Sequence, residues 1–164
     1  MHLSVQQLDV LTRDLAPVRV KRLQGKFSYL EAYDVKATLI RVFGFGGFSS
    51  EVVSSMIVAT DEKPQANNPE RTNNVAICQA TVRLTVYCPE RCGNDAVYTE
   101  TAIASNAQPD KAEALDQALK SAESDALKRA AVFLGTQFGL SLYNDGSTAE
   151  VVRAIFAPGE QEAF

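Results

Sequence analysis

The 164-residue sequence has little of what enzymes and membrane proteins depend on. It lacks tryptophan, and its single histidine, His2, lies at the N-terminus, so a serine or cysteine nucleophile lacks the histidine that would act as its base. No apolar run reaches the roughly 18 residues that a membrane span needs, and the first residues lack the basic and apolar regions of a signal peptide. We therefore expect a cytoplasmic binding protein without a membrane partner.

Cofactor and metal motifs are also scarce. The glycine-rich segment 44–47 lacks the Gly-Lys-Ser/Thr ending of an ATP-binding loop, and it follows a predicted helix. It is more typical of a tight helix-to-strand turn. The cysteines, Cys78, Cys88 and Cys92, are odd in number, which argues against a disulfide framework. Four metal ligands cannot be assembled from them, so the sequence predicts no cofactor and no metal.

The charge is acidic overall but unevenly distributed. The net charge is −4, and residues 142–164 hold four acidic residues against Arg153. Residues 13–26 contain five basic residues and one acidic residue. A basic strip is therefore possible on a nearly neutral body, although the total charge alone argues against nucleic-acid binding.

The hydrophobic pattern predicts an α+β fold. Strands are expected at 48–59, 75–88 and 95–105, with apolar residues at every second position of 75–88. The polar residues 61–74 are expected to form a loop. Because the strands are grouped rather than alternating with helices, the pattern predicts an antiparallel sheet of three to four strands.

Helices are predicted on both sides of these strands. Residues 5–16 and 29–43 have helical spacing. The residues expected on the buried face of the second helix are Leu30, Tyr33, Ala37, Leu39 and Ile40. Residues 110–138 predict one long helix that packs on the sheet through an alanine-rich stripe, with a possible bend near Gly135 and Gly139.

Basic residues on two of these elements are the candidate binding residues. They are Lys111, Lys120, Lys128 and Arg129 on the long helix, and Arg83 on the polar face of the second strand. The alternative explanation is ordinary exposure to solvent together with pairing to nearby carboxylates. The expected pairs are Asp116 with Lys120, Asp125 with Arg129, and Glu100 with Arg83.

Two segments resemble the signatures of a known family. Residues 29–52 read YLEAYDVKATLIRVFGFGGFSSEV, and residues 118–143 read ALKSAESDALKRAAVFLGTQFGLSLY. The first resembles a Tyr-hydrophobic-Glu start that leads through a helix to a Phe-Gly turn. The second resembles a helix with Leu-Lys-Arg-Ala followed by two glycines. Together they make residues 3–145 similar to the Rad52 family of single-strand annealing proteins.

The resemblance implies a β-β-β-α core whose subunits assemble into a ring. A basic groove around that ring would hold single-stranded DNA by its backbone, with the bases turned outward. Lys128 and Arg129 match the Lys-Arg pair that contacts DNA phosphates, Lys120 matches a common basic position, and Lys111 lies near a second one. The implied function is ATP-independent annealing of complementary strands in homologous recombination and double-strand break repair.

The sequence also departs from the family pattern. Val132 and Asp34 stand where basic residues often occur, and Phe48 replaces a tryptophan. The resemblance implies an annealing domain at residues 1–145 and an acidic tail at 146–164, without the partner-recruiting half of longer members. Such short versions resemble those of phages or bacteria, so we expect the cytoplasm of a bacterial host, with a recombination exonuclease or the host single-strand binding protein as possible partners.

Two other functions fit the pattern of elements. A long helix on an antiparallel sheet also describes hot-dog domains, which bind ligands or hydrolyse thioesters, although no acidic or histidine base is evident. A pure assembly protein would use the long helix for subunit contacts and would not bind nucleic acid.

Overall fold

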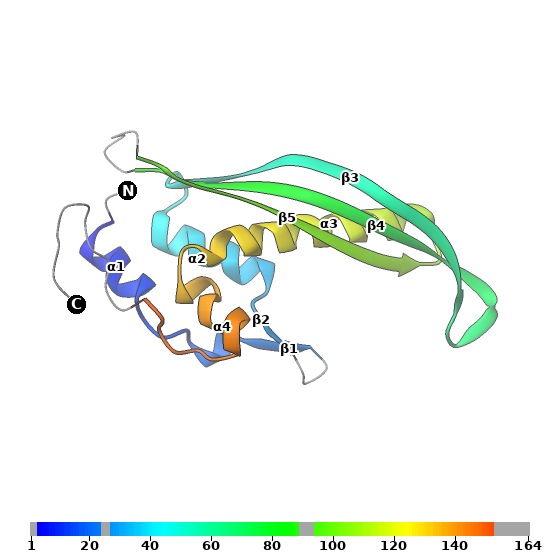
Figure 1. The fold of residues 1–164 in the computed structure, drawn as a ribbon, viewed down its shortest axis with the longest axis horizontal. Helices are drawn as coiled ribbons and strands as arrows, with labels where there is room; N and C mark the ends of the chain where they lie inside the picture. The colour runs from blue at the N-terminus through cyan, green and yellow to red at the C-terminus, as the bar shows by residue number, and fades with distance from the viewer. Residues whose placement is uncertain (1–2, 24–26, 89–93, 153–164) are drawn as a thin grey trace.

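The computed structural model describes residues 3–23, 27–88 and 94–152 (Figure 1). In chain order the elements are α1 (Val5–Leu11), the short 3-10 helix η1 (Pro17–Arg19), β1 (Lys21–Leu23), β2 (Phe27–Tyr29), α2 (Ala32–Phe43), β3 (Phe48–Gln65), β4 (Asn68–Val86), β5 (Ala96–Gln108), α3 (Lys111–Val132), the 3-10 helix η2 (Thr136–Phe138) and α4 (Leu140–Asp145). Within these residues, no helix is both long and apolar enough to cross a membrane.

Strands β3, β4 and β5 form an antiparallel sheet in that order, so the predicted α+β class is confirmed. The alternation in β4 is confirmed as well, because its even-numbered residues from Ala76 to Val86 are buried and face α3. Its odd-numbered residues lie on the opposite face of the sheet, which no helix covers in Figure 1. Helix α3 therefore shields only one face.

Helix α3 packs along β4 and β5 through small side chains. Asp110 caps its start by accepting a hydrogen bond from the Glu113 amide at 2.8 Å. Its buried residues are Ala114, Ala118, Ala122, Ala126, Leu127, Ala130 and Ala131. Because most of these are alanines, the helix axis can approach the sheet closely, and the alanine-rich stripe predicted from the sequence is confirmed.

The polar segment 61–74 is strand, so the predicted loop is wrong. Strand β3 continues to Gln65 and β4 begins at Asn68, with Asp61 opposite Val75 and Lys63 opposite Asn73. Figure 1 shows this hairpin extending past the N-terminal end of α3. The hairpin has no covering helix there, so a polar composition suits a strand as well as a loop. Pro64 is tolerated because β3 is an edge strand.

The predicted single helix at 110–138 is interrupted after Val132. Gly135 has a φ of 101° and Gly139 a φ of 96°, so the chain turns twice, through η2 and into α4. Residues with a side chain rarely adopt these angles. The expected bend near these glycines is therefore a complete break, and it carries α4 back beside the C-terminal half of α3 (Figure 1).

The buried face of α2 matches the prediction only in part. Tyr33 is exposed, and Leu30 is buried but precedes the helix. The residues that α2 buries are Val35, Thr38, Leu39 and Val42. Leu39 was predicted correctly, whereas Ala37 and Ile40 are only partly buried. Because Thr38 is polar, it interrupts the hydrophobic pattern of the face that α2 buries.

A buried polar cluster holds α2, η1 and η2 together. Arg19 forms an ion pair with Asp34 at 2.8 Å, and both side chains are largely buried. Arg19 also donates to Thr38 Oγ1, to Gln137 Oε1 and to the Gln137 carbonyl oxygen. The Gln137 amide in turn donates to the carbonyl oxygens of Arg13 and Asp14. We call Arg19, Asp34, Thr38 and Gln137 the Arg19 cluster.

Two turn positions complete the comparison with the sequence. The segment 44–47 is the expected helix-to-strand turn: Gly44 has a φ of 80°, and a Cβ on Gly47 would lie 1.9 Å from the Phe43 carbonyl oxygen. Cys88 is disulfide-bonded, although the odd number of cysteines argued against a disulfide framework. Cys92 lies outside the described residues.

Candidate functional site

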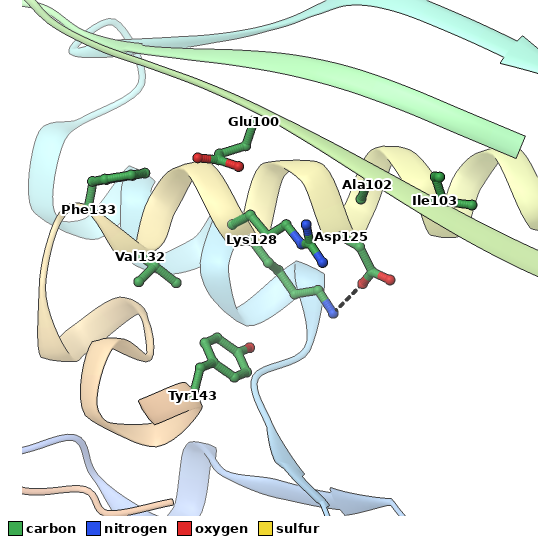
Figure 2. Close-up of a pocket in the computed structure, with 9 residues that line it drawn as sticks. Glu100, Ala102, Ile103, Asp125, Lys128, Val132, Phe133 and Tyr143 are labelled. Carbon is green, nitrogen blue, oxygen red and sulfur yellow. Dashed lines mark ion pairs between the residues drawn. The ribbon is translucent and has the colours of Figure 1, made fainter. Parts of the chain in front are cut away.

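A cleft of about 570 Å³ lies between β5, the C-terminal half of α3 and α4 (Figure 2). Its lining residues are Glu100, Ala102, Ile103, Asp125, Lys128, Arg129, Val132, Phe133 and Tyr143. The break after Val132 creates this cleft, because it brings α4 back to form a wall opposite β5. Lys128 and Arg129 are the two candidate residues that the structure brings together in it.

Lys128 is held inside the cleft by two neighbours. Its Nζ lies 2.6 Å from Asp125 Oδ1, and its side chain is only 20% exposed. The same Nζ lies 5.9 Å from the centre of the Tyr29 ring, at the outer limit of a cation–π contact. Asp125 therefore pairs with Lys128 three residues on, and not with Arg129 as the spacing suggested.

Arg129 lies beside Lys128 and is exposed. One guanidinium nitrogen donates to the Thr101 carbonyl oxygen on β5 at 3.1 Å. Among the described residues, no carboxylate lies within ion-pair distance of it, and the other donors of its guanidinium have no partner. Arg129 thus keeps a fixed position while most of its donors remain available to an anion.

Two carboxylates oppose the two cations. Glu100 projects from β5 above α3 in Figure 2, and Asp125 lies next to Lys128. The cleft is therefore close to neutral in formal charge, although its cations lie side by side. Because the Lys128–Asp125 pair is partly solvent-exposed, its net stabilisation is small, on the order of 0–1 kcal/mol. An incoming phosphate can compete with Asp125 for Lys128.

The other walls of the cleft are aromatic. The Tyr143 hydroxyl accepts a hydrogen bond from the Leu30 amide at 3.1 Å, which fixes α4 beside the start of α2. Phe133 stacks on Tyr98 of β5, with ring centres 5.1 Å apart and planes 2° apart. Neither Phe133 nor Tyr143 was among the candidate binding residues predicted from the sequence. The Gly135 and Gly139 pair was the signal that α3 ends before them.

Lys120 lies on a different flank of α3. It pairs with Asp116 at 2.6 Å, as predicted, and its side chain is 71% exposed. It lines a groove with Lys36, Glu123 and residues of β3. Lys120 therefore borders α2 and β3 and does not line the cleft beside β5.

Lys111 and Arg83 lie elsewhere again. Lys111 starts α3, roughly 26 Å along the helix from Lys128, in a hollow that also contains Asp61 and Glu62. Arg83 pairs with Glu51 of β3 at 3.2 Å, and not with Glu100. Since Arg83 has the opposite parity to the buried residues of β4, it lies on the face of the sheet away from α3.

The described residues offer neither a cluster of metal ligands nor, at Cys78, a reactive thiol. In the described parts of the chain, no three His, Cys, Asp or Glu side chains gather closely enough to hold a metal ion. Cys78 is buried beneath α3, and that burial raises the pKa of its thiol. A raised pKa disfavours the thiolate that a nucleophile needs.

A comparison with protein-family models identifies the family. The model described as "Rad52/22 family double-strand break repair protein" matches residues 6–160, which include the whole cleft. The chain belongs to the Rad52/22 family. The resemblance carried by residues 29–52 and 118–143 is therefore confirmed, and the Lys128–Arg129 cleft lies within the residues that the family model matches.

Two curated relatives are similar over most of this Rad52/22 family chain. The DNA repair and recombination protein RAD52 of Saccharomyces cerevisiae is 30% identical over 156 residues, and that of Eremothecium gossypii is 28% identical over 155 residues. Each alignment covers 90% of this chain. The chain itself spans only 30% and 32% of the lengths of these two relatives.

Proposed function

We propose that this protein binds single-stranded DNA and anneals complementary strands in recombination and double-strand break repair. Membership of the Rad52/22 family and the printed names of its two relatives support this role. The observation that carries the proposal is the Lys128–Arg129 pair, which stands in an open cleft with most donors of Arg129 unused. The role needs no bond cleavage and no ATP.

The cleft suits a DNA backbone better than a buried substrate. Arg129 presents a planar fork of donors that matches two phosphate oxygens. Lys128 supplies a second cation once a phosphate displaces Asp125 from it. Two phosphate contacts bind weakly, but counterion release adds up when several subunits hold one strand. A chain with a net charge of −4 can therefore bind DNA through this local pair.

We also propose that subunits assemble side by side into a ring. Strand β3 is an edge of the sheet, and a cluster of large apolar side chains on it is exposed. These residues are Val52, Val53, Met56, Ile57 and Val58. An exposed apolar edge strand promotes association with another chain, so a neighbouring subunit would protect it. The ring would line up many copies of the Lys128–Arg129 cleft.

Replacing both Lys128 and Arg129 by alanine tests the proposed site. Binding of fluorescent oligothymidylate, measured by anisotropy at several salt concentrations, should weaken strongly. The slope of log K against log salt should fall by at least about 1.4, because each lost phosphate contact removes about 0.7 from it. Annealing of complementary strands should be lost, while thermal unfolding and oligomer size stay unchanged.

The matched control removes two cations far from the cleft. Lys63 and Arg71 are both exposed on the β3–β4 hairpin, so replacing both by alanine changes the net charge equally. This variant should bind and anneal like the original protein. Equal loss in both double variants, or no loss in the first, would refute the cleft as the DNA site. If the original protein forms oligomers but does not bind the oligonucleotide, the result would favour a pure assembly protein.

A further inference from the structure

Tyr143 holds its hydroxyl group at a fixed position in the cleft. Its ring packs over Gly139, where an added Cβ would lie 2.6 Å from Tyr143 Cε2. At the other end of the side chain, the hydroxyl oxygen accepts the hydrogen bond from the Leu30 amide at 3.1 Å. Tyr143 is nevertheless 43% exposed, and Figure 2 shows its ring rising from α4 below Lys128. These two contacts fix an exposed hydroxyl in the wall of the cleft.

The hydroxyl proton of Tyr143 has no partner within the fold. A phenol donates one hydrogen bond and also accepts hydrogen bonds. The Leu30 amide uses the oxygen as an acceptor, so the proton points away from that amide. Among the residues that the structure describes, none accepts a hydrogen bond from this hydroxyl. Because Tyr143 lines the cleft, the proton is available to an acceptor there.

The hydroxyl of Tyr143 lies at the same end of the cleft as Lys128. The Leu30 amide that holds the hydroxyl follows directly after Tyr29 in the chain. The Tyr29 ring is the one that lies 5.9 Å from Lys128 Nζ. Both polar groups therefore border the short connection between β2 and α2. A phosphate has several acceptor oxygens, so one oxygen can pair with Lys128 while another accepts from the hydroxyl.

We propose that the Tyr143 hydroxyl donates a hydrogen bond to the backbone phosphate that Lys128 binds. This inference rests on the proposed function, since it adds a neutral donor to the two cations of the same site. Tyrosine is among the side chains that proteins use to donate to phosphate oxygens. The contact involves only the sugar-phosphate backbone, so the bases stay turned outward, as the family resemblance implies. Because the hydroxyl is neutral, its contact with a phosphate releases no counterion.

Tyr143→Phe tests the contact, because it removes the hydroxyl and keeps the ring. Affinity for oligothymidylate, measured by fluorescence anisotropy, should fall about 2- to 12-fold for each subunit that holds the strand, the range for one lost hydrogen bond. The slope of log K against log salt should stay unchanged, whereas Lys128→Ala should lower it by about 0.7. A strand of the same length made of abasic sugar-phosphate units should lose as much affinity as oligothymidylate, because the contact involves no base.

Two further variants separate hydrogen-bond donation from structural support. Tyr33→Phe is the matched control, because Tyr33 is exposed on α2 and does not line the cleft. It should bind both strands like the original protein. Replacing Tyr143 by O-methyltyrosine keeps an oxygen that accepts from the Leu30 amide but leaves no proton to donate. This variant should bind as weakly as Tyr143→Phe, while its thermal unfolding matches that of the original protein.

The outcomes separate the role of Tyr143 from the phosphate site itself. If the O-methyltyrosine variant binds like the original protein, the hydroxyl acts only by holding Leu30, and the proposal is wrong. A lower salt slope for Tyr143→Phe also overturns it, because that variant would then have displaced a cation. If replacing Lys128 and Arg129 by alanine weakens binding while both Tyr143 variants bind normally, the phosphate site stands and only the role of Tyr143 fails. If that double variant binds like the original protein, the DNA site fails and the role of Tyr143 fails with it.

Discussion

The Arg19 cluster and the Lys128–Arg129 cleft use arginine in opposite ways. The Arg19 side chain is 13% exposed and donates to a carboxylate, a hydroxyl, an amide oxygen and a backbone carbonyl. Arg129 is exposed and donates to a single backbone carbonyl. The first guanidinium is fully committed to holding three segments of the chain together. The second is positioned by the fold and left with donors for a ligand.

The difference shows that clustered charge in the sequence does not by itself mark a binding surface. Residues 13–26 are the most basic stretch, yet Arg13 pairs with Asp9 and Arg19 is buried against Asp34. Of its described cations, only Lys21 and Arg22 are exposed without an ion pair, and they lie on the short strand β1. Lys26 lies outside the described residues. The two cations of the cleft come instead from a helix that also carries several acidic residues. A cation can bind a ligand only through the hydrogen-bond donors that have no partner within the fold.

Removing Arg19 should have the largest effect on the folded state. Arg19→Met leaves Asp34 largely buried without a counter-charge, so we expect a loss of about 3–5 kcal/mol in the free energy of unfolding. Urea denaturation followed by circular dichroism measures it. Arg13→Ala is the matched control, because the Arg13–Asp9 pair is exposed and should contribute less than about 1 kcal/mol.

A double variant sharpens this result. Arg19→Met combined with Asp34→Leu removes both charges, and an apolar replacement of a buried pair is often close to neutral. Much of the stability lost in Arg19→Met should therefore return. If Arg19→Met costs no more than Arg13→Ala, the cluster does not hold these segments together, and the contrast between the two arginines fails.

The sequence predicted the sheet well because its signal is local. Alternation in 75–88 identified β4 and its buried face, and the alanine stripe identified α3. Errors arose where the local signal is ambiguous. Polarity in 61–74 fits a loop and an uncovered ribbon equally, and only the pairing of β3 with β4 decides between them. The buried face of α2 was predicted only in part, because Thr38 is buried through its bond to Arg19, which lies 19 residues earlier.

The candidate site was predictable only in part. The Leu-Lys-Arg-Ala motif identified Lys128 and Arg129, since it depends on neighbouring residues of one helix. Glu100, Phe133 and Tyr143 join the cleft from β5, the end of α3 and α4, so the break at Gly135 and Gly139 decides their position. The departure at Asp34 also has a structural explanation: its carboxylate is the partner of Arg19.

Neutralising Asp125 should strengthen DNA binding. Asp125→Asn frees Lys128 and removes a negative charge beside the incoming phosphate, so we expect about 1.5- to 5-fold higher affinity for oligothymidylate, the range that corresponds to a partly exposed ion pair. Asp116→Asn is the matched control, because it removes one charge from the same helix beside Lys120. Equal tightening in both variants would mean that net charge alone, and not release of Lys128, controls affinity.

Lys120 should show the smallest effect of the cations on α3. It lies on the side of α3 that faces β3, is largely exposed, and forms a solvent-exposed ion pair with Asp116. A DNA strand held in the cleft beside β5 would be attracted to Lys120 only weakly, because salt screens charges at that distance. Lys120→Ala should therefore lower affinity for oligothymidylate by less than about twofold at physiological salt, and Lys111→Ala by no more than that. A loss from Lys120→Ala as large as that from Lys128→Ala would place the DNA across the groove between α3 and β3, because only there could Lys120 contact a phosphate directly.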